Sequence, residues 1–265
     1  IQATAQYNRP ENRVWAIPHL AGLDFTTGTP QPITTSLANP NEACASVCDT
    51  AGNLLFYTNG MTVWDGNGDT LYSLRRIKRL FPTYSTISVA QGALIVPMPD
   101  SAHKYYVFSL EESKGRLYVN IIDRNLDNGN GDIDTNYALR NIPIDSNNTQ
   151  KMVAVAGCEN NVWVLVHGED TTVFKAFEIT ASGLNLTPVL SYAGHFKASS
   201  YDNGVMKISP NRRKLLTCNF SYLPARPGLE VYDFDYMTGK VSNAVILDSF
   251  SHYGGSFSPD NSKVY

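Results

Sequence analysis

The feature that most constrains the fold of this chain is a short pattern that recurs along it. The pattern first occurs in residues 45–71, where three apolar runs alternate with turn sequences. The turns carry Asp-Thr-Ala-Gly-Asn, Asn-Gly and Asp-Gly-Asn-Gly-Asp. Asn-Gly and Asp-Gly pairs adopt the positive φ that tight turns need, so short apolar runs between them predict antiparallel hairpins. This segment is therefore predicted to be a small β-meander.

Four further copies of the pattern follow, and the chain stops inside the last of them. The predicted strands are Ala45–Cys48, Leu54–Thr58, Met61–Trp64, Ala93–Pro97, Lys104–Leu110, Arg116–Asp123, Met152–Gly157, Val162–His167, Val173–Ile179, Gly204–Ser209, Lys214–Asn219, Leu229–Asp235, Gly255–Phe257 and Lys263–Tyr265. Equivalent turn positions are Asp49, Asp100, Glu159, Asn211 and Asp260, with spacings of 51, 59, 52 and 49 residues. A period of about 40 to 50 residues with about four strands per copy is typical of a β-propeller. The predicted fold class is all-β: a propeller of WD-repeat-like four-stranded blades, about four to five of them in this chain.

The same pattern divides the chain into two parts. Residues 1–40 are predicted to be an N-terminal arm with a closing strand, for which Ile33–Ser36 is the candidate, and residues 41–265 to be the blades. Because an interrupted hairpin at Ser258–Tyr265 would leave strand edges unpaired, we expect the chain to be a fragment of a longer protein, or its ordered part.

Composition limits the partners of such a domain. The chain has 265 residues, of which 43% are hydrophobic and 17% charged, which suits a folded domain with a large core. A net charge of −3 gives no support for binding to nucleic acid or to anionic membranes. No apolar run approaches the ~18 residues of a membrane helix, so no membrane span is predicted.

Two kinds of residue leave alternatives open at the sequence level. The four cysteines, Cys44, Cys48, Cys158 and Cys218, are interpreted as buried free thiols, with a Cys44–Cys48 disulfide or metal binding as alternatives. The Asp/Asn/Gly runs at 65–69 and 123–134 are candidates for calcium loops, because calcium prefers oxygen ligands. Neither run fits the EF-hand spacing, and a tight hairpin explains each equally well. No metal or cofactor residue is therefore assigned.

A catalytic site is not evident from the residues. The five histidines are His19, His103, His167, His195 and His252, and none belongs to a known metal or nucleophile motif. Propeller funnels collect side chains from equivalent blade positions, so the candidates for a central acid–base pocket are His167, Tyr201, Asp202 and His252. Glu42, Asp202 and Asp248 are unranked candidates for a carboxylate pair. The preferred interpretation is that these are ordinary loop and core residues, and that the chain is not an enzyme.

Several segments resemble a known family. Residues 15–25 (WAIPHLAGLDF) and 49–68 (DTAGNLLFYTNGMTVWDGNG) resemble the N-terminal propeller region of large Bacteroidetes surface proteins. Residues 94–110 (LIVPMPDSAHKYYVFSL) are similar to the second blade of that family, and residues 207–216 and 257–265 to its SPDG-type turns. The resemblance spans residues 15–265. It departs from the family at Trp15–Pro18, where an aromatic-Phe-Gly entry is usual, and at Asn211–Lys214, which replaces an Asp-Gly turn.

The resemblance implies a location and a set of partners. Members of the family are secreted to the outer cell surface and have about seven blades in the full domain. PKD-like or other adhesive repeats often follow, and then a gliding-motility-type C-terminal domain that the type IX secretion machinery reads. In this chain such parts would lie beyond Tyr265. The family implies no catalytic residues.

These observations predict a non-catalytic, secreted cell-surface propeller module for binding, adhesion or assembly. Its expected partners are other surface or matrix proteins or glycans. A secreted carbohydrate-active enzyme, a lyase or glycosidase that uses the central funnel, is the alternative. An intracellular protein-interaction propeller is the third possibility. Convergent acidic and histidine side chains with room for a sugar would favour the enzyme.

Overall fold

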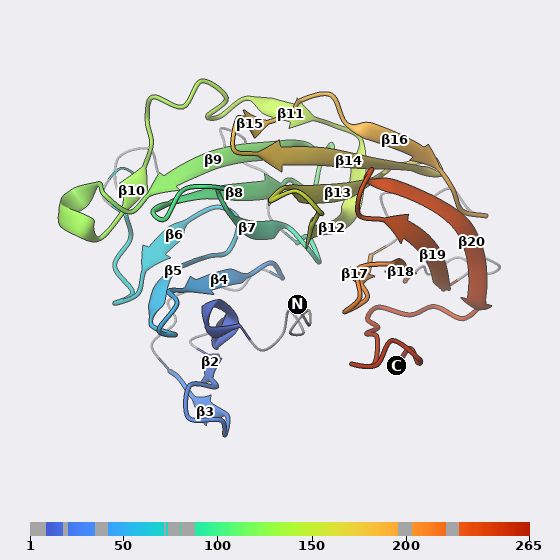
Figure 1. Cartoon of the computed structure of the whole chain (residues 1–265), viewed down its shortest axis with the longest axis horizontal. Coiled ribbons are helices and arrows are strands. Elements are labelled where there is room, and N and C mark those ends of the chain that lie inside the picture. Colours follow the sequence, from blue (N-terminus) through green and yellow to red (C-terminus); the bar gives the residue numbers. More distant parts are fainter. Residues whose placement is uncertain are drawn as a thin grey trace. The chain divides into compact units, whose positions relative to one another are not determined.

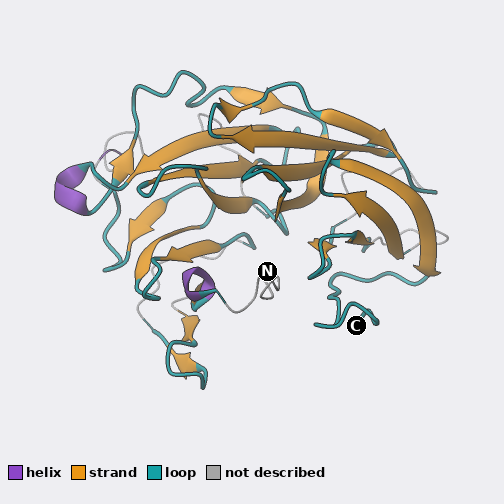
Figure 2. Ribbon diagram, viewed as in Figure 1, coloured by secondary structure: helices purple, strands orange, loops and turns teal. Residues whose placement is uncertain are grey.

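A computed structural model describes residues 9–17, 21–34, 42–71, 73, 80, 88–195, 203–220 and 228–265. Strands dominate these residues, and the 3-10 helices η2 (Pro10–Asn12) and η3 (Asp127–Gly129) span three residues each (Figure 2). The predicted all-β class is confirmed in the form of several small antiparallel sheets. No helix in the described ranges is long and apolar enough to cross a membrane.

The chain divides into two compact units. Unit 1 comprises Ile1–Pro97 and Ser101–Asp145, and unit 2 comprises Met98–Asp100 and Ser146–Tyr265. Each unit has a hydrophobic cluster of its own.

The described residues of unit 1 form three antiparallel sheets (Figure 1). Their strands are β1 (Val14–Ile17), β2 (Ala21–Asp24), β3 (Gln31–Pro32), β4 (Ala45–Cys48), β5 (Leu54–Thr58), β6 (Val63–Asp65), β7 (Ala93–Pro97), β8 (Lys104–Leu110), β9 (Leu117–Asp123), β10 (Asp132–Ile133) and β11 (Pro143–Asp145). The sheet orders are β1-β2-β3, β4-β5-β6 and β10-β9-β8-β7, and β11 also pairs with β9. β4 lies beside both β1 and β7, so the first strands of successive sheets are neighbours.

Unit 2 repeats this plan in two antiparallel sheets within the described residues. Their strands are β12 (Asn148–Ala156), β13 (Val162–Gly168), β14 (Val173–Thr180), β15 (Gly183–Leu184), β16 (Val189–Tyr192), β17 (Met206–Ile208), β18 (Lys214–Cys218), β19 (Leu229–Asp235) and β20 (Lys240–Asp248). The orders are β12-β13-β14-β15, with β16 also on β14, and β17-β18-β19-β20. β12 lies beside β17, and β16 lies beside β20. After β20, Phe257 and Val264 form one antiparallel bridge.

The strand predictions are confirmed for most of the chain. β4, β5, β7, β8 and β19 have the predicted bounds, and the predicted last hairpin is present as the bridge between Phe257 and Val264. The turns follow from their side chains. The carboxylate of Asp49, for example, accepts hydrogen bonds from the backbone N–H groups of Ala51 and Asn53, both at 2.9 Å. Such Asx geometry closes the β4–β5 hairpin locally.

The N-terminal segment differs from its prediction. Ile33 and Thr34 are not in a strand, and residues 35–36 of the predicted strand lie outside the described residues. The chain instead forms the hairpin of β1 and β2, followed by β3. The hydroxyl of Ser46, on β4, donates a 2.7 Å hydrogen bond to the carbonyl oxygen of Val14, which attaches this sheet to the next. The role of residues 1–40 as a closing arm stays a prediction.

A hydrophobic cluster holds the second and third sheets of unit 1 together. It consists of Val47, Phe56, Val63, Leu71, Leu80, Val107, Tyr118, Ile122 and Ile133. The ring of Phe56 meets Tyr105 edge-on, with centroids 5.3 Å apart, and the Asn120 amide donates a 2.9 Å hydrogen bond to the Leu80 carbonyl oxygen. Each large side chain buried in this way stabilises the fold by about 1.5–3 kcal/mol relative to its exposure.

Trp163 connects the two sheets of unit 2. Its indole Nε1 donates a 2.9 Å hydrogen bond to the carbonyl oxygen of Tyr236, in the turn between β19 and β20. The Arg212 guanidinium lies 4.4 Å from the centre of the Tyr236 ring and donates to the carbonyl oxygens of Ala156 and Gly157. An aromatic ring, a cation and backbone carbonyls thus fix one sheet against the other.

Candidate functional site

A buried carboxylate lies in unit 2 at the start of β19. Glu230 is 2% exposed, and its Oε2 accepts a 2.7 Å hydrogen bond from the hydroxyl of Tyr232. Its Oε1 lies 2.9 Å from Nδ1 of His195 and accepts a 3.1 Å bond from the backbone N–H of His195. Burial raises the pKa of the Tyr232 phenol, and the adjacent Glu230 charge adds to this shift. The phenol therefore stays protonated and donates to the carboxylate at neutral pH.

The backbone at Gly194 permits this arrangement. Gly194 has φ of 116°, which side-chain-bearing residues rarely adopt, and a Cβ there would lie 3.1 Å from the Tyr232 hydroxyl. The glycine lets the chain after β16 pass close to Tyr232, and it thereby brings His195 onto Glu230. Because Glu230 and Tyr232 are both buried, the geometry fits a hydrogen-bonded junction that joins two sheets better than a pocket for substrate.

A second set of buried titratable side chains comes from β12, β13 and β18 in unit 2. Lys151 is 1% exposed, His167 is 4% exposed, and Cys218 is fully buried. Burial, reinforced by the Lys151 charge, lowers the pKa of His167 to about 3, so the ring is neutral at pH 7. Its Nδ1 has no hydrogen-bond partner among the residues that the structure describes, and the ring packs edge-on against Phe174, with centroids 4.4 Å apart. Burial raises the pKa of Cys218 to about 11, which keeps its thiol protonated and unreactive.

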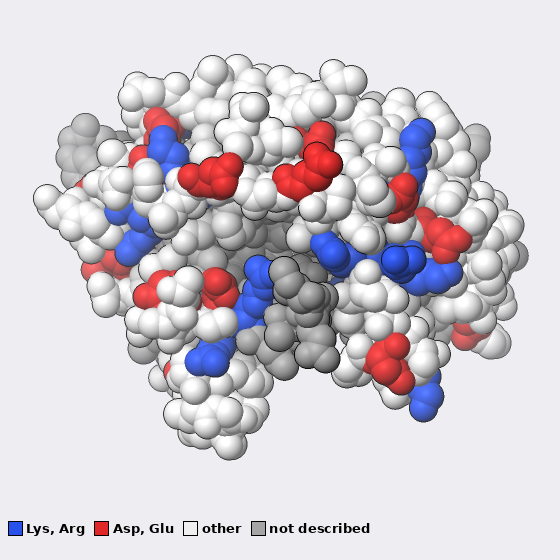
Figure 3. All heavy atoms as spheres, viewed as in Figure 1, with Lys and Arg blue, Asp and Glu red and all other residues white. Residues whose placement is uncertain are grey.

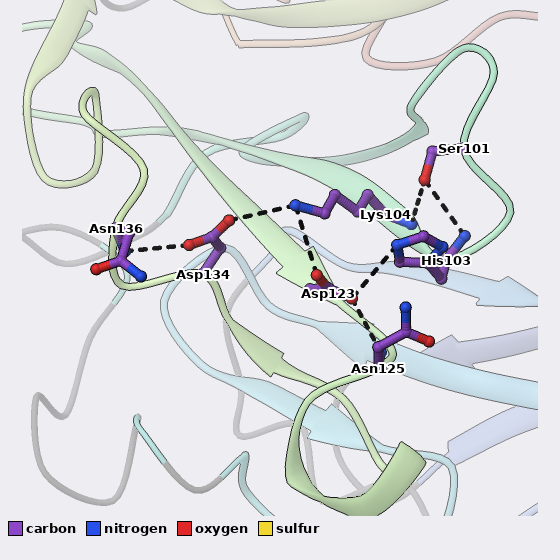
Figure 4. A network of polar contacts seen from close by, with 7 residues as sticks. All are labelled: Ser101, His103, Lys104, Asp123, Asn125, Asp134 and Asn136. Carbon is purple, nitrogen blue, oxygen red and sulfur yellow. Dashed lines mark hydrogen bonds and ion pairs between the residues drawn. The ribbon is translucent and has the colours of Figure 1, made fainter.

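In unit 1, a lysine lies between two carboxylates where β8 begins and where β9 and β10 end (Figure 4). Lys104 Nζ is 3.5 Å from Asp123 Oδ2 and 3.5 Å from Asp134 Oδ2. His103 Nε2 lies 3.9 Å from the other oxygen of Asp123. The hydroxyl of Ser101 accepts a 3.1 Å hydrogen bond from the backbone N–H of Lys104, and this bond fixes the start of β8. Asp123 and Asp134, the first and last carboxylates of the run at 123–134, therefore both lie beside the Lys104 ammonium group.

The other calcium candidate, 65–69, is a tight hairpin. Asp65 Oδ1 accepts the backbone N–H groups of Asn67 and Asp69, each at 2.9 Å. Over the described parts of the chain, no three His, Cys, Asp or Glu side chains lie close enough together to hold a metal ion.

An open cavity of about 530 Å³ lies in unit 1, where the loops after β2, β4, β6 and β9 meet. Its lining combines polar and apolar side chains: Val14, Asp24, Thr26, Ile33, Ala51, Gly52, Asn53, Leu54, Leu55, Asp65, Gly66, Asn67, Arg124 and Asn130. Among the described residues, acidic and basic side chains occur in small separate groups on the face in Figure 3.

Unit 2 exposes large apolar side chains along β16, β20 and the residues after β20. We call this set the outer strip; it comprises Leu190, Tyr192, Val245, Ile246, Leu247 and Phe250. Tyr192 is 76% exposed and Phe250 is 75% exposed. The two strands are joined by a 3.0 Å hydrogen bond from the Val241 N–H to the Ser191 hydroxyl, and by a 3.4 Å bond from Lys240 Nζ to the Leu190 carbonyl oxygen.

Of the described residues named as catalytic candidates, His252 and Asp248 lie together, whereas His167 and Glu42 contact residues outside the candidate set. His167 packs on Phe174, whereas His252 Nε2 lies 3.0 Å from Asp248 Oδ2 near the surface. Glu42, named as a candidate for a carboxylate pair, accepts a 3.0 Å hydrogen bond from the hydroxyl of Ser88. His19, Tyr201 and Asp202 lie outside the described residues.

All four cysteines are free, so the Cys44–Cys48 disulfide alternative is wrong. Cys48 and Cys218 are buried as expected, but Cys44 and Cys158 are exposed, which corrects the interpretation of four buried thiols.

Sequence reasoning missed Glu230, Tyr232 and Lys151. The available signal was the place of Glu230 in LEVYDFD, where it alternates with Tyr232 and Phe234; Lys151, which follows the polar residues Asn148–Gln150, gave no such signal. A charge at a strand position that alternation would bury indicates a partnered polar group.

Comparisons with known proteins assign the chain to no family. No protein-family model and no curated protein matches the sequence. A provisionally assigned 6-phosphogluconolactonase from Bacteroides uniformis is 10% identical, with a TM-score of 0.49 over 92% of this chain and 69% of that chain. A functionally unknown protein from Desulfotomaculum acetoxidans is 9% identical, with a TM-score of 0.43 over 92% and 70%. Hydrazine synthase from Kuenenia stuttgartiensis is 13% identical, with a TM-score of 0.40 over 83% and 50%. Similarity at this level assigns no activity, substrate or partner to this chain.

Proposed function

We propose that the chain is part of a β-propeller that serves as a non-catalytic binding and assembly module at the outer cell surface. Two features support the propeller. The sheets recur at the spacing expected of blades, and within each unit the first strands of successive sheets are neighbours, β4 with β7 and β12 with β17. Secretion and surface location rest on the family resemblance of residues 15–25 and 49–68.

The outer strip of unit 2 is the observation that carries the binding role. Single exposed apolar residues are normal on proteins, but the strip gathers six large ones on the neighbouring strands β16 and β20 and just after β20, and exposed apolar surface of this kind is typical of an interaction site. The strip has the aromatic anchors that dominate binding energy at interfaces, Tyr192 and Phe250, each about three-quarters exposed. We expect its partner to be another surface or matrix protein.

The partner is expected to contact side chains of the strip rather than to extend the sheet. β20 is the last strand of its sheet, but its pairing with β19 is irregular at two points and Asn243 has φ of 52°. Bulges of this kind twist an edge strand and oppose strand addition. The apolar side chains of Val245, Ile246 and Leu247 remain accessible beside this interrupted edge.

A photo-cross-linking experiment on intact cells of the native source tests this function. A photoreactive phenylalanine analogue is placed at position 246 in the strip or, as a control, at exposed position 181 in the β14–β15 turn. We expect a discrete cross-linked surface protein from position 246 and none from position 181. Equal products from both positions, or none on intact cells, would contradict the proposal.

A further inference from the structure

The cavity of unit 1 has the size and the fixed polar groups of a small-ligand site. Its volume of about 530 Å³ falls within the ~300–1,000 Å³ that such sites occupy. Four loops from all three sheets of the unit contribute to it, so its shape depends on packing rather than on a single turn.

Two carboxylates in the cavity wall are held in place by their own turns. Asp24 Oδ1 accepts the backbone N–H of Thr26 at 2.7 Å, and this bond lowers the pKa of Asp24. Asp65 Oδ1 accepts two backbone N–H groups at 2.9 Å. The side chain of Thr26 adds a further hydrogen bond to the Asp24 carboxylate. Each turn therefore holds its carboxylate in place at the cavity wall, where its remaining acceptor capacity is available to a ligand, and fixing a group before binding lowers the cost of binding.

Arg124 supplies donors on the β9–β10 side of the cavity. Its backbone N–H donates to the His103 carbonyl oxygen at 2.8 Å, and its Nη1 donates to the carbonyl oxygen of Asn130. Gly131 makes room for it, because a Cβ there would lie 3.1 Å from Arg124 Cδ. A guanidinium has five N–H donors, so several remain for a ligand.

The balance of charge selects the class of ligand. A phosphate or carboxylate ligand would be repelled by the two carboxylates, and a cationic ligand would be repelled by the guanidinium. A neutral ligand with several hydroxyls satisfies both, because a hydroxyl donates to a carboxylate and accepts from a guanidinium. Val14, Ile33, Leu54 and Leu55 add apolar surface on which the C–H face of a sugar ring can pack.

We propose that this cavity binds a neutral saccharide, with Asp24 and Asp65 accepting from its hydroxyls and Arg124 donating to them. The site lies in unit 1 and uses no residue of the outer strip in unit 2. An absence of saccharide binding in unit 1 is therefore distinguishable from an absence of partner binding by the outer strip.

Saturation-transfer NMR and calorimetry on the purified chain test the site. The probes are the methyl glycosides of glucose, galactose, mannose and N-acetylglucosamine, with inorganic phosphate as an anionic probe. We expect at least one glycoside to bind in the millimolar range, and Asp24→Asn and Arg124→Gln each to weaken its binding by about tenfold or more. Asp260→Asn is the matched control, because Asp260 closes a similar turn in unit 2 through the Ser262 N–H.

Thermal unfolding of each variant separates lost binding from lost folding, and Asn67→Ala is a further test should Arg124→Gln fail to fold. Three outcomes would overturn the assignment: no glycoside binds, Asp24→Asn binds the glycoside as well as the parent chain does, or phosphate binds in preference to every glycoside.

Discussion

His195, after β16, holds Glu230, on β19, through both its ring and its backbone N–H, at 2.9 Å and 3.1 Å. The Tyr232 hydroxyl completes the set of donors around this buried carboxylate. A buried charge that loses a partner costs more than the partner's bond contributes on average, because the charge remains desolvated. The junction between the two sheets of unit 2 should therefore be sensitive to small changes here.

Replacing Tyr232 by Phe should destabilise the fold by about 1–3 kcal/mol, because Glu230 Oε2 loses its donor. The measurement is the free energy of unfolding from urea titration. Tyr192→Phe is the matched control, since Tyr192 is 76% exposed and its change should stay within about 0.5 kcal/mol. Equal effects of the two variants would argue against a stabilising hydrogen bond between the Tyr232 hydroxyl and Glu230.

Replacing Gly239 by Ala should also destabilise unit 2, by about 1–3 kcal/mol. Gly239 has φ of +72°, and a Cβ there would lie 2.7 Å from Cε3 of Trp163. Gly254→Ala is the control, because no atom lies within 4 Å of a Cβ at that position. Thermal unfolding compares the two, and a Gly239→Ala variant as stable as Gly254→Ala would show that Trp163 does not pack there.

Much of the fold follows from the sequence because its causes are local. Turns such as Asp49–Asn53 close through their own side chains, so β4 and β5 were predictable to the residue. The His195 partner of Glu230 comes from a segment 35 residues away in the chain, and no local pattern specifies that contact. For the same reason the cavity of unit 1 could not be predicted, since it forms where four separate loops meet.

Acid should destabilise the fold partly through His167. Its pKa in the folded chain is lowered from 6.5 to about 3, so between these values the unfolded chain binds a proton that the folded chain does not. Stability is therefore lost as the pH falls below about 6.5, by up to about 1.4 kcal/mol per pH unit from this group. His167→Leu should flatten that dependence in urea titrations at about pH 7.5 and about pH 4.5.

Val166→Ala is the control for His167, because Val166 is fully buried on the same strand and does not titrate. It should leave the acid dependence near that of the parent chain. An unchanged slope in His167→Leu would show that the His167 ring takes up its proton in the folded state.

Charges placed in the outer strip should leave the fold intact. Ile246 is 42% exposed and Phe250 is 75% exposed, so Ile246→Lys with Phe250→Asp should change the free energy of unfolding by less than about 1 kcal/mol. Urea titration measures this. A large loss of stability would show that these side chains support the core instead of an interface.

Binding of the purified, fluorescently labelled chain to intact cells of its native source tests the proposed surface role most directly. We predict saturable binding by the parent chain and a loss of about tenfold or more in affinity for the Ile246→Lys, Phe250→Asp variant. Equal binding by the two proteins, or no binding by the parent chain, would contradict the assignment of the outer strip as the interaction surface.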